Sequence, residues 1–176
     1  MNFILTGFMG TGKTKTGQII ADKLKFQFID TDSLVESKVK LSIGEIFENL
    51  GEKFFRELES EIIKDMSQKD RLVISCGGGA VLDFQNIKNL HKNGVIINLK
   101  ATSETIFERL KDDNTRPLLK CQNPLEKIKE LLSVRKLAYE NCDLSFSTDF
   151  LTEAETAEII IEKIKFLYLN LFESIK

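Results

Sequence analysis

The stretch GFMGTGKT at Gly7–Thr14 decides the fold, because it fits the pattern G-x-x-x-x-G-K-[ST]. It follows the apolar run NFILT at Asn2–Thr6, which predicts a strand, and it opens a predicted helix over Lys13–Lys25. A glycine-rich turn could carry the same letters, but the fixed positions coincide by chance in fewer than about one chain in a hundred. Strand, loop and helix together predict a phosphate-binding loop.

The chemistry of this loop suits a nucleoside triphosphate with Mg²⁺. Its glycines let successive backbone N–H groups point at one anion, and the helix N-terminus adds the positive end of its dipole. Lys13 is placed to reach the β- and γ-phosphates, and the Thr14 hydroxyl can ligate Mg²⁺ directly. The same loop serves motors, GTPases and small-molecule kinases, so the loop alone leaves the class of protein open.

Strands and helices alternate along the rest of the chain. The runs that are typical of strands buried on both faces are Asn2–Thr6, Phe26–Ile29, Leu72–Ser75, Val95–Leu99 and Leu144–Ser147. No linker or repeat divides the sequence. The pattern predicts a single α/β domain over residues 1–176, built on a five-stranded parallel sheet.

Several predicted helices have recognisable starts. Ser42 and Glu45 have the spacing of a capping box, and Asn123 before Pro124 matches an N-cap followed by proline. A second capping box opens a long helix from Thr152 to about Ser174. Its apolar spacing favours core packing over a partner surface, so we expect a monomer.

Composition and charge exclude several other classes. The 176 residues are 42% hydrophobic and 30% charged with a net charge of -2, so no global positive field gathers nucleic acid or an anionic membrane. Cys76, Cys121, Cys142 and the single His91 match no zinc spacing and favour free thiols in a reducing cytosol. With no secretion signal and no apolar run of membrane length, we expect a cytoplasmic protein.

The carboxyl ends of the first three predicted strands carry the most reactive side chains and turns. A parallel sheet binds its ligands beyond those ends, where this chain has Gly7–Thr14, Asp30 with Asp32, and Gly77–Gly79. The strand that ends at Ser75 lacks the terminal Asp of a Walker B strand, and no Asn-Lys-x-Asp guanine reader occurs, which argues against motors and GTPases. Asp30 and Asp32 are therefore candidates for Mg²⁺ or for the nucleophile, although such residues also cap helices.

Three isolated arginines could hold an anionic acceptor. Arg56 could instead form an ordinary helical ion pair with Glu52 or Glu59, and Arg135 could simply favour a helix C-terminus. Arg116 lies in the polar stretch 111–123, which has no periodicity and which we interpret as a mobile lid over the phosphates.

Taken together, these pieces resemble the shikimate kinase family over almost the whole chain. The motifs that carry the resemblance are Gly7–Thr14, Asp30-Thr31-Asp32, Gly51-Glu52-x-x-Phe55-Arg56-x-x-Glu59, Gly77–Gly79, Arg116–Leu119 and Arg135-x-x-x-Tyr139. The resemblance implies a three-layer αβα P-loop kinase fold with a mobile lid, similar to nucleoside monophosphate kinases. In that family ATP phosphorylates the 3-hydroxyl of shikimate, a step of aromatic amino-acid biosynthesis.

The resemblance also implies roles for individual residues. The acceptor segment would be 31–62, where Asp32 would contact the shikimate hydroxyls and act as base. Further shikimate-binding residues would be Phe47 and Phe55 as walls, Arg56 and Arg135 on the carboxylate, and Gly78 and Gly79 through backbone N–H groups. ATP would be bound by Gly10, Thr11, Gly12, Lys13, Thr14, Lys15, Arg109 against adenine, and the lid residue Arg116. Asp30 and Ser75 would support Mg²⁺ through water, and Lys13, Asp32 and Arg116 would be catalytic.

One position departs from the family, and two other functions stay open. The family commonly has a second hydroxyl residue after the Thr14 position, whereas Lys15 stands here and offers its backbone N–H to the α-phosphate. One alternative is a kinase for another hydroxy acid such as gluconate, and the other is a nucleotide-dependent switch without an acceptor. Asp32, Arg56 and Arg135 argue against a switch, which needs no second anion site.

Overall fold

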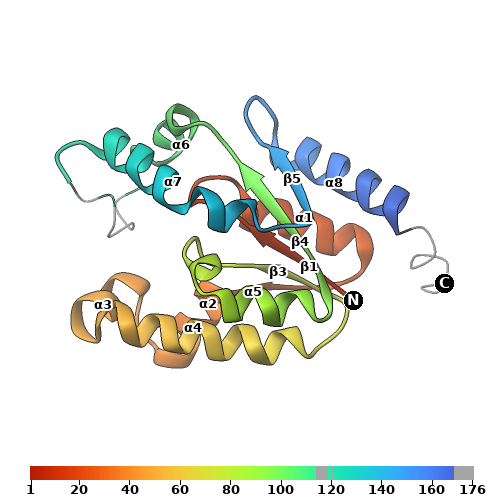
Figure 1. The fold of residues 1–176 in the computed structure, drawn as a ribbon, viewed down its shortest axis with the longest axis horizontal. Helices are drawn as coiled ribbons and strands as arrows, with labels where there is room; N and C mark the ends of the chain where they lie inside the picture. The colour runs from red at the N-terminus through yellow and green to blue at the C-terminus, as the bar shows by residue number, and fades with distance from the viewer. Residues whose placement is uncertain (114–118, 120, 169–176) are drawn as a thin grey trace.

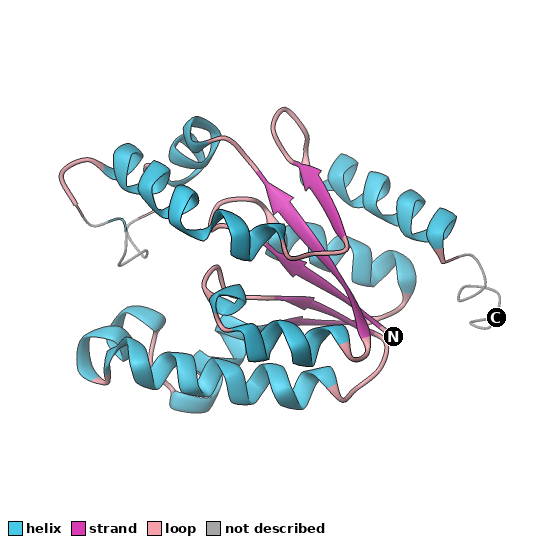
Figure 2. Cartoon of the chain, viewed as in Figure 1, coloured by secondary structure: helices cyan, strands magenta, loops and turns pink. Residues whose placement is uncertain are grey.

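The structure, a computed structural model, describes residues 1–113, 119 and 121–168. Its centre is one parallel sheet with the strand order β2-β3-β1-β4-β5, which confirms the predicted sheet (Figure 2). The strands are β1 (Asn2–Thr6), β2 (Gln27–Asp30), β3 (Leu72–Ser75), β4 (Gly94–Lys100) and β5 (Leu144–Ser147). Within the described ranges, no helix has the length and apolar character needed to cross a membrane.

Helices cover both faces of the sheet and extend beyond one edge (Figure 1). They are α1 (Lys13–Leu24), α2 (Thr31–Val39), α3 (Ile43–Asn49), α4 (Gly51–Ser67), the short 3₁₀ helix η1 (Ala80–Leu82), α5 (Phe84–His91), α6 (Ser103–Leu110), α7 (Pro124–Glu140) and α8 (Glu153–Leu167). Helices α2, α3 and α4 gather into one group at the lower left of Figure 1 and share a small apolar core of their own. The three layers are those of the expected αβα fold.

The alternation of side chains along β1 explains the layers. Phe3 and Leu5 face α1 and α8, where they pack with Ile20 and Ile160. Ile4 faces the opposite side, whose cluster is built from residues of α4, α5, α6 and α7. Because successive side chains of a strand point to opposite faces, an apolar run such as NFILT serves both layers at once.

Two predicted boundaries near the site shift by one residue. The strand predicted at Phe26–Ile29 runs from Gln27 to Asp30, and α1 ends one residue before Lys25. Lys25 adopts the left-handed conformation with φ 57°, and the Phe26 N–H donates to the Ala21 carbonyl at 2.9 Å. Phe26 thus closes the helix end, and the strand ladder begins one residue later.

The helix starts were predicted more accurately than one helix end. Both capping boxes, Ser42 with Glu45 and Thr152 with Glu155, are present. Asn123 is the N-cap of α7 and Pro124 its first residue, as predicted, although the Asn123 side chain makes no capping hydrogen bond. Helix α8 ends at Leu167, and the remainder of the predicted helix to Ser174 lies outside the described residues apart from Tyr168, its C-cap.

The strand order places the carboxyl ends of β1, β2 and β3 side by side. The chain leaves β1 for β2 on one side, and the later strand β4 pairs with β1 on the other side. In an open parallel sheet, this reversal of strand order forms a crevice beyond the carboxyl ends of the strands. The loops after Thr6 and Ser75 and the start of α2 after Asp30 all border that crevice.

Close packing between α1 and the sheet leads to a test of the fold. A Cβ at Gly17 would lie 2.7 Å from Phe28 Cε2 and 3.0 Å from Leu5 Cδ1, so Gly17→Ala should destabilise the protein by about 1–3 kcal/mol. Gly44 of α3 has only Ser42 Oγ at 4.0 Å, so Gly44→Ala should be neutral or stabilising by up to about 1 kcal/mol. Urea unfolding of both variants measures this difference, and equal stabilities would contradict the packing.

Candidate active site

The loop Gly7–Thr14 curls between β1 and α1 as the motif predicts. Gly7, Gly10 and Gly12 have φ values of 134°, 80° and 87°, which side chains rarely adopt. The Lys13 ammonium folds back over the loop and donates to the carbonyls of Gly7 and Phe8, both at 2.9 Å. The loop therefore holds a cation at its centre, where an incoming phosphate would meet it.

A cavity of about 550 Å³ opens directly over this loop. One end is formed by residues at or just beyond the carboxyl ends of β2 and β3, namely Asp30, Asp32, Ser75, Cys76 and Gly78. The other end is formed by Arg109, Leu110, Thr148, Leu151, Thr152 and Glu153. Because the loop residues Met9 to Thr16 line the floor between the two ends, a ligand held by the loop would extend toward both.

Asp30 joins the loop to the second strand. Its Oδ2 accepts a hydrogen bond from the Thr14 hydroxyl at 2.9 Å, and its Oδ1 accepts from the Ser33 N–H at 3.2 Å. Asp30 therefore caps α2 and also faces the phosphate loop. Ser75 is its partner in the β2–β3 register and is buried. Thr14, the predicted direct ligand of Mg²⁺, thus borders one cavity with Asp30 and Ser75, which are expected to act through water.

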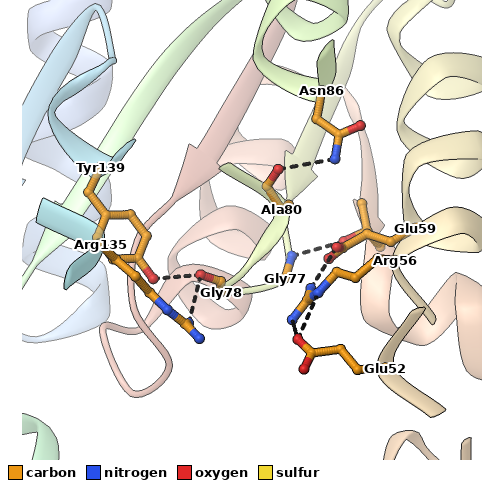
Figure 3. Close-up of polar contacts among 10 residues, drawn as sticks. Glu52, Arg56, Glu59, Gly77, Gly78, Ala80, Asn86, Arg135 and Tyr139 are labelled. Atoms are coloured by element: carbon orange, nitrogen blue, oxygen red, sulfur yellow. Dashed lines mark hydrogen bonds and ion pairs between the residues drawn. The ribbon is translucent and has the colours of Figure 1, made fainter. Parts of the chain in front are cut away.

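The glycine segment Gly77–Gly79 lies at the junction of the remaining site residues (Figure 3). The Gly77 N–H donates to Thr31 Oγ1 at 2.9 Å, and a Cβ on Gly77 would collide with Asp32 Oδ1 and Glu59 Oε1. A Cβ on Gly79 would lie 2.5 Å from the Arg56 guanidinium. The segment can therefore approach these charged groups only because it lacks side chains.

Arg135 approaches the same segment from the opposite side in Figure 3. The residue is only 7% exposed, and its Nη1 lies 3.5 Å from the Gly78 carbonyl oxygen. The Tyr139 hydroxyl donates to the same carbonyl at 2.5 Å. Arg135 does not serve as a solvated charge at the end of α7, because α7 buries it against the glycine segment.

Arg56 has the helical ion pairs that the sequence allowed, and it also lies on the glycine segment. Its Nη2 is 3.1 Å from Glu52 Oε1, and its Nη1 is 2.7 Å from Glu59 Oε2. Burial opposes the charged guanidinium, but the carboxylates of Glu59 and Glu52 outweigh it and raise the pKa of Arg56. The helical ion pairs are therefore present, and Arg56 also lies beside Gly79; its role toward an anionic acceptor stays a prediction.

Glu59 is the residue whose role the sequence reasoning missed. Its side chain is 1% exposed, and burial raises its pKa to about 7 although Arg56 acts in the opposite direction. Its Oε1 has no hydrogen-bond partner among the described residues. The i,i+3 spacing to Arg56 signalled an ion pair, but only the packing of α4 against the glycine segment shows that the carboxylate is buried.

Of the two aromatic residues predicted as pocket walls, Phe55 lies beneath Arg56, and Phe47 packs against Phe55. Phe47 and Phe55 have ring centroids 5.1 Å apart, and the Arg56 guanidinium carbon is 4.9 Å from the Phe55 centroid. Phe55 is 3% exposed and belongs to the apolar core of α2, α3 and α4. In this structure the pair supports Arg56, and neither ring is among the described residues that line the cavity.

Arg109 stands at the other end of the cavity. It donates through Nη1 to the Gly10 carbonyl at 3.1 Å and to Thr148 Oγ1 at 3.0 Å, and through Nη2 to the Thr148 carbonyl at 2.8 Å. These bonds connect the phosphate loop to the segment after β5. Arg116, with the central part of the predicted lid 111–123, lies outside the described residues.

The chain is similar to shikimate kinases in sequence and in structure. The family model described as shikimate kinase matches residues 9–165. Shikimate kinases of Thermodesulfovibrio yellowstonii and Caldicellulosiruptor saccharolyticus are 49% and 50% identical, over 92% and 91% of this chain and 94% and 93% of theirs.

Solved structures agree with these sequence matches. Shikimate kinase from Acinetobacter baumannii in complex with shikimate has a TM-score of 0.92 at 32% identity, covering 96% of this chain and 94% of that one. The Aquifex aeolicus enzyme has a TM-score of 0.81 at 34% identity, covering 96% and 99%. With its phosphate loop, paired aspartates and glycine segment, this chain belongs to the shikimate kinase family.

Proposed function

We propose that the protein transfers the γ-phosphoryl group of ATP to the 3-hydroxyl of shikimate. The observation that carries this proposal is the position of Asp32 and Gly78 at one end of the phosphate-loop cavity, with Arg56 and Arg135 on the adjoining glycine segment. A phosphoryl donor held by the loop and an anionic alcohol held by the arginines would meet beside Asp32. Membership of the shikimate kinase family favours shikimate over gluconate as the acceptor. A nucleotide-dependent switch would need no acceptor site.

Catalysis would depend on placement and charge. Phosphoryl transfer spreads negative charge over the transferring oxygens, and Lys13 is already centred on the loop that would hold them. Asp32 is half-buried at the cavity end and would orient or deprotonate the attacking hydroxyl. We keep the expected roles of Gly10, Thr11, Gly12 and Thr14 at the phosphates, of Arg109 at adenine and of Arg116 at the transferring phosphate.

The residues around Thr14 fit Mg²⁺. The Thr14 hydroxyl and an Asp30 carboxylate oxygen are 2.9 Å apart, and the Ser75 hydroxyl borders the same cavity. A set of oxygen donors beside a phosphate site is what this hard cation prefers. Thr14 would hold Mg²⁺ directly and Asp30 and Ser75 would hold it through water, and the bound cation would supply positive charge beside the phosphates.

The acceptor carboxylate would bind between Arg56 and Arg135, with Gly78 and Gly79 beside it. Glu59 is buried, whereas the Glu52 side chain is 53% exposed, so the substrate carboxylate would displace Glu52 and leave Glu59 in place. Phe47 and Phe55 would support this arrangement from below. Replacement of one exposed carboxylate by another keeps the charge of Arg56 balanced.

We also propose a single domain over residues 1–176, with an acceptor segment at 31–62 and a lid at 111–123. Ile160, Ile161 and Ile164 of α8 are buried in the core, which supports packing over dimerisation for that helix. With a net charge of -2, the protein is proposed to act as a cytoplasmic monomer without nucleic acid or membrane partners.

Acceptor dependence tests the proposed reaction. With ATP and Mg²⁺, the purified protein should release ADP rapidly when shikimate is present, because shikimate supplies the hydroxyl that accepts the phosphoryl group. Release should be at least about tenfold slower with gluconate or without an acceptor. ADP release that is equally fast in all three cases would contradict the assignment of the acceptor.

Asp32→Asn should lower kcat by about 10² to 10⁴, because it removes the carboxylate from the attacking hydroxyl. ATP affinity should change far less, since Asp32 lies at the acceptor end of the cavity. Asp22→Asn, on the exposed surface of α1, is the control and should leave both values unchanged. If steady-state kinetics show a loss confined to ATP binding, Asp32 belongs with the metal ligands.

Arg56→Lys and Arg135→Lys should each raise the shikimate KM about tenfold to hundredfold, because a lysine cannot offer the planar fork that binds both carboxylate oxygens. ATP binding without acceptor should stay the same. Arg71→Lys is the matched control, since its guanidinium lies 5.6 Å from the Phe26 centroid and away from the cavity residues. Unchanged shikimate titrations for both site variants would rule out the carboxylate clamp.

A further inference from the structure

An ion pair at the edge of the cavity joins two helix starts. Lys15 Nζ in the first turn of α1 lies 3.5 Å from Glu153 Oε1 at the first residue of α8. Both residues line the phosphate-loop cavity, and their side chains are 77% and 42% exposed. Neither side chain is fixed by the core, so the pair can open without disturbing the fold.

Glu153 places a negative charge beside a loop that is built to hold anions. The position of a Cβ on Gly12 would be 3.6 Å from Glu153 Cγ, so the glutamate packs directly against the loop. Its own backbone N–H lowers the pKa of Glu153, and Lys15 and Arg109 act in the same direction against partial burial. An ionised carboxylate here would repel a polyphosphate unless a nearby cation compensates it.

The position of Lys15 relative to the cavity identifies which phosphate it can reach. The γ-phosphate would lie toward Asp32 and Gly78, the acceptor end, and the nucleoside toward Arg109 and Thr148. Lys15 pairs with Glu153, a residue of the nucleoside end. The phosphate nearest to that end is the α-phosphate, and the flexible four-carbon stem of a lysine can turn toward it.

We propose that Lys15 leaves Glu153 for the α-phosphate when a nucleotide binds. Lys15 is then a side-chain phosphate ligand of this chain, and Glu153 is a competitor that keeps the ammonium group beside the empty loop. This inference rests on the proposed function, because it requires a nucleotide on the phosphate loop. The resemblance to the family implies only backbone donation at Lys15, so the side-chain contact is an additional one.

The same two helices supply a matched control. Lys23 Nζ of α1 lies 2.6 Å from Glu158 Oε1 of α8, and both side chains are partly exposed. Neither residue is among the described residues that line the cavity. Substitutions of Lys23 or Glu158 therefore show how the loss of an ion pair between α1 and α8 affects stability and nucleotide affinity when the cavity is unchanged.

Calorimetric titrations with ADP, AMP and adenosine, by competition where binding is weak, test the exchange. Lys15→Thr should weaken ADP and AMP by the same factor, about fivefold to tenfold, and leave adenosine unchanged. Lys15→Arg should stay within about twofold of the parent, because the charge is kept. Glu153→Gln should tighten the binding of ADP and AMP about twofold to fivefold, since the side chain that competes for Lys15 is then neutral.

The control variants Lys23→Thr and Glu158→Gln should change none of these affinities. Thermal unfolding should be alike for Lys15→Thr and Lys23→Thr.

The ligand series separates the possible failures. If Lys15→Thr weakens ADP but not AMP, or weakens adenosine equally, then Lys15 does not contact the α-phosphate. Unchanged ADP affinity in Lys15→Thr also overturns the exchange, while the parent's own ADP binding leaves the proposed function standing. If the parent binds no ADP, the proposed function fails and the exchange fails with it.

Discussion

The close approach of the backbone at Gly77–Gly79 to charged side chains is the constraint on which the site depends. A Cβ at Gly77 would meet the carboxylates of Asp32 and Glu59, and a Cβ at Gly79 would meet the Arg56 guanidinium. Arg135 and Tyr139 bind the Gly78 carbonyl from the other side (Figure 3). Since β3 delivers this segment next to the phosphate loop, the sheet brings donor and acceptor groups within one crevice.

Burial makes the charges around this segment interdependent. Glu59 is buried beside Asp32 and Arg56, and its pKa is raised to about 7. As pH falls, a carboxyl group whose pKa is raised by folding binds its proton at a higher pH in the folded protein than in the unfolded chain. Its contribution to stability is therefore greatest at low pH and declines as pH rises from about 4.5 toward 7. Arg56 limits this cost by pairing with Glu59 at 2.7 Å.

The sequence alone predicted the sheet and the parts of the site that follow strand ends. Loop Gly7–Thr14 and residues Asp30 and Asp32 were predictable because strand patterns and local motifs locate them along the chain. The position of β2 was off by one residue, because the end of α1 is fixed by the left-handed Lys25.

Contacts between distant elements were not predictable from local patterns. The spacing of apolar residues indicates which face of α4 is buried, but it does not show that Glu59 is buried against Gly77. Lys15 and Glu153 are 138 positions apart in the sequence, and their pairing likewise depends on how α1 and α8 pack. Such contacts come from tertiary packing, so the sequence motifs alone do not reveal them.

A crystal structure of the protein with ADP and shikimate tests the central claim most directly. The account predicts that the shikimate carboxylate lies between Arg56 and Arg135 beside Gly78 and Gly79, with a hydroxyl within hydrogen-bond distance of Asp32. The ADP phosphates should lie on the loop Gly7–Thr14. A shikimate carboxylate bound at Lys13, or a shikimate ring bound away from the glycine segment, would contradict the account.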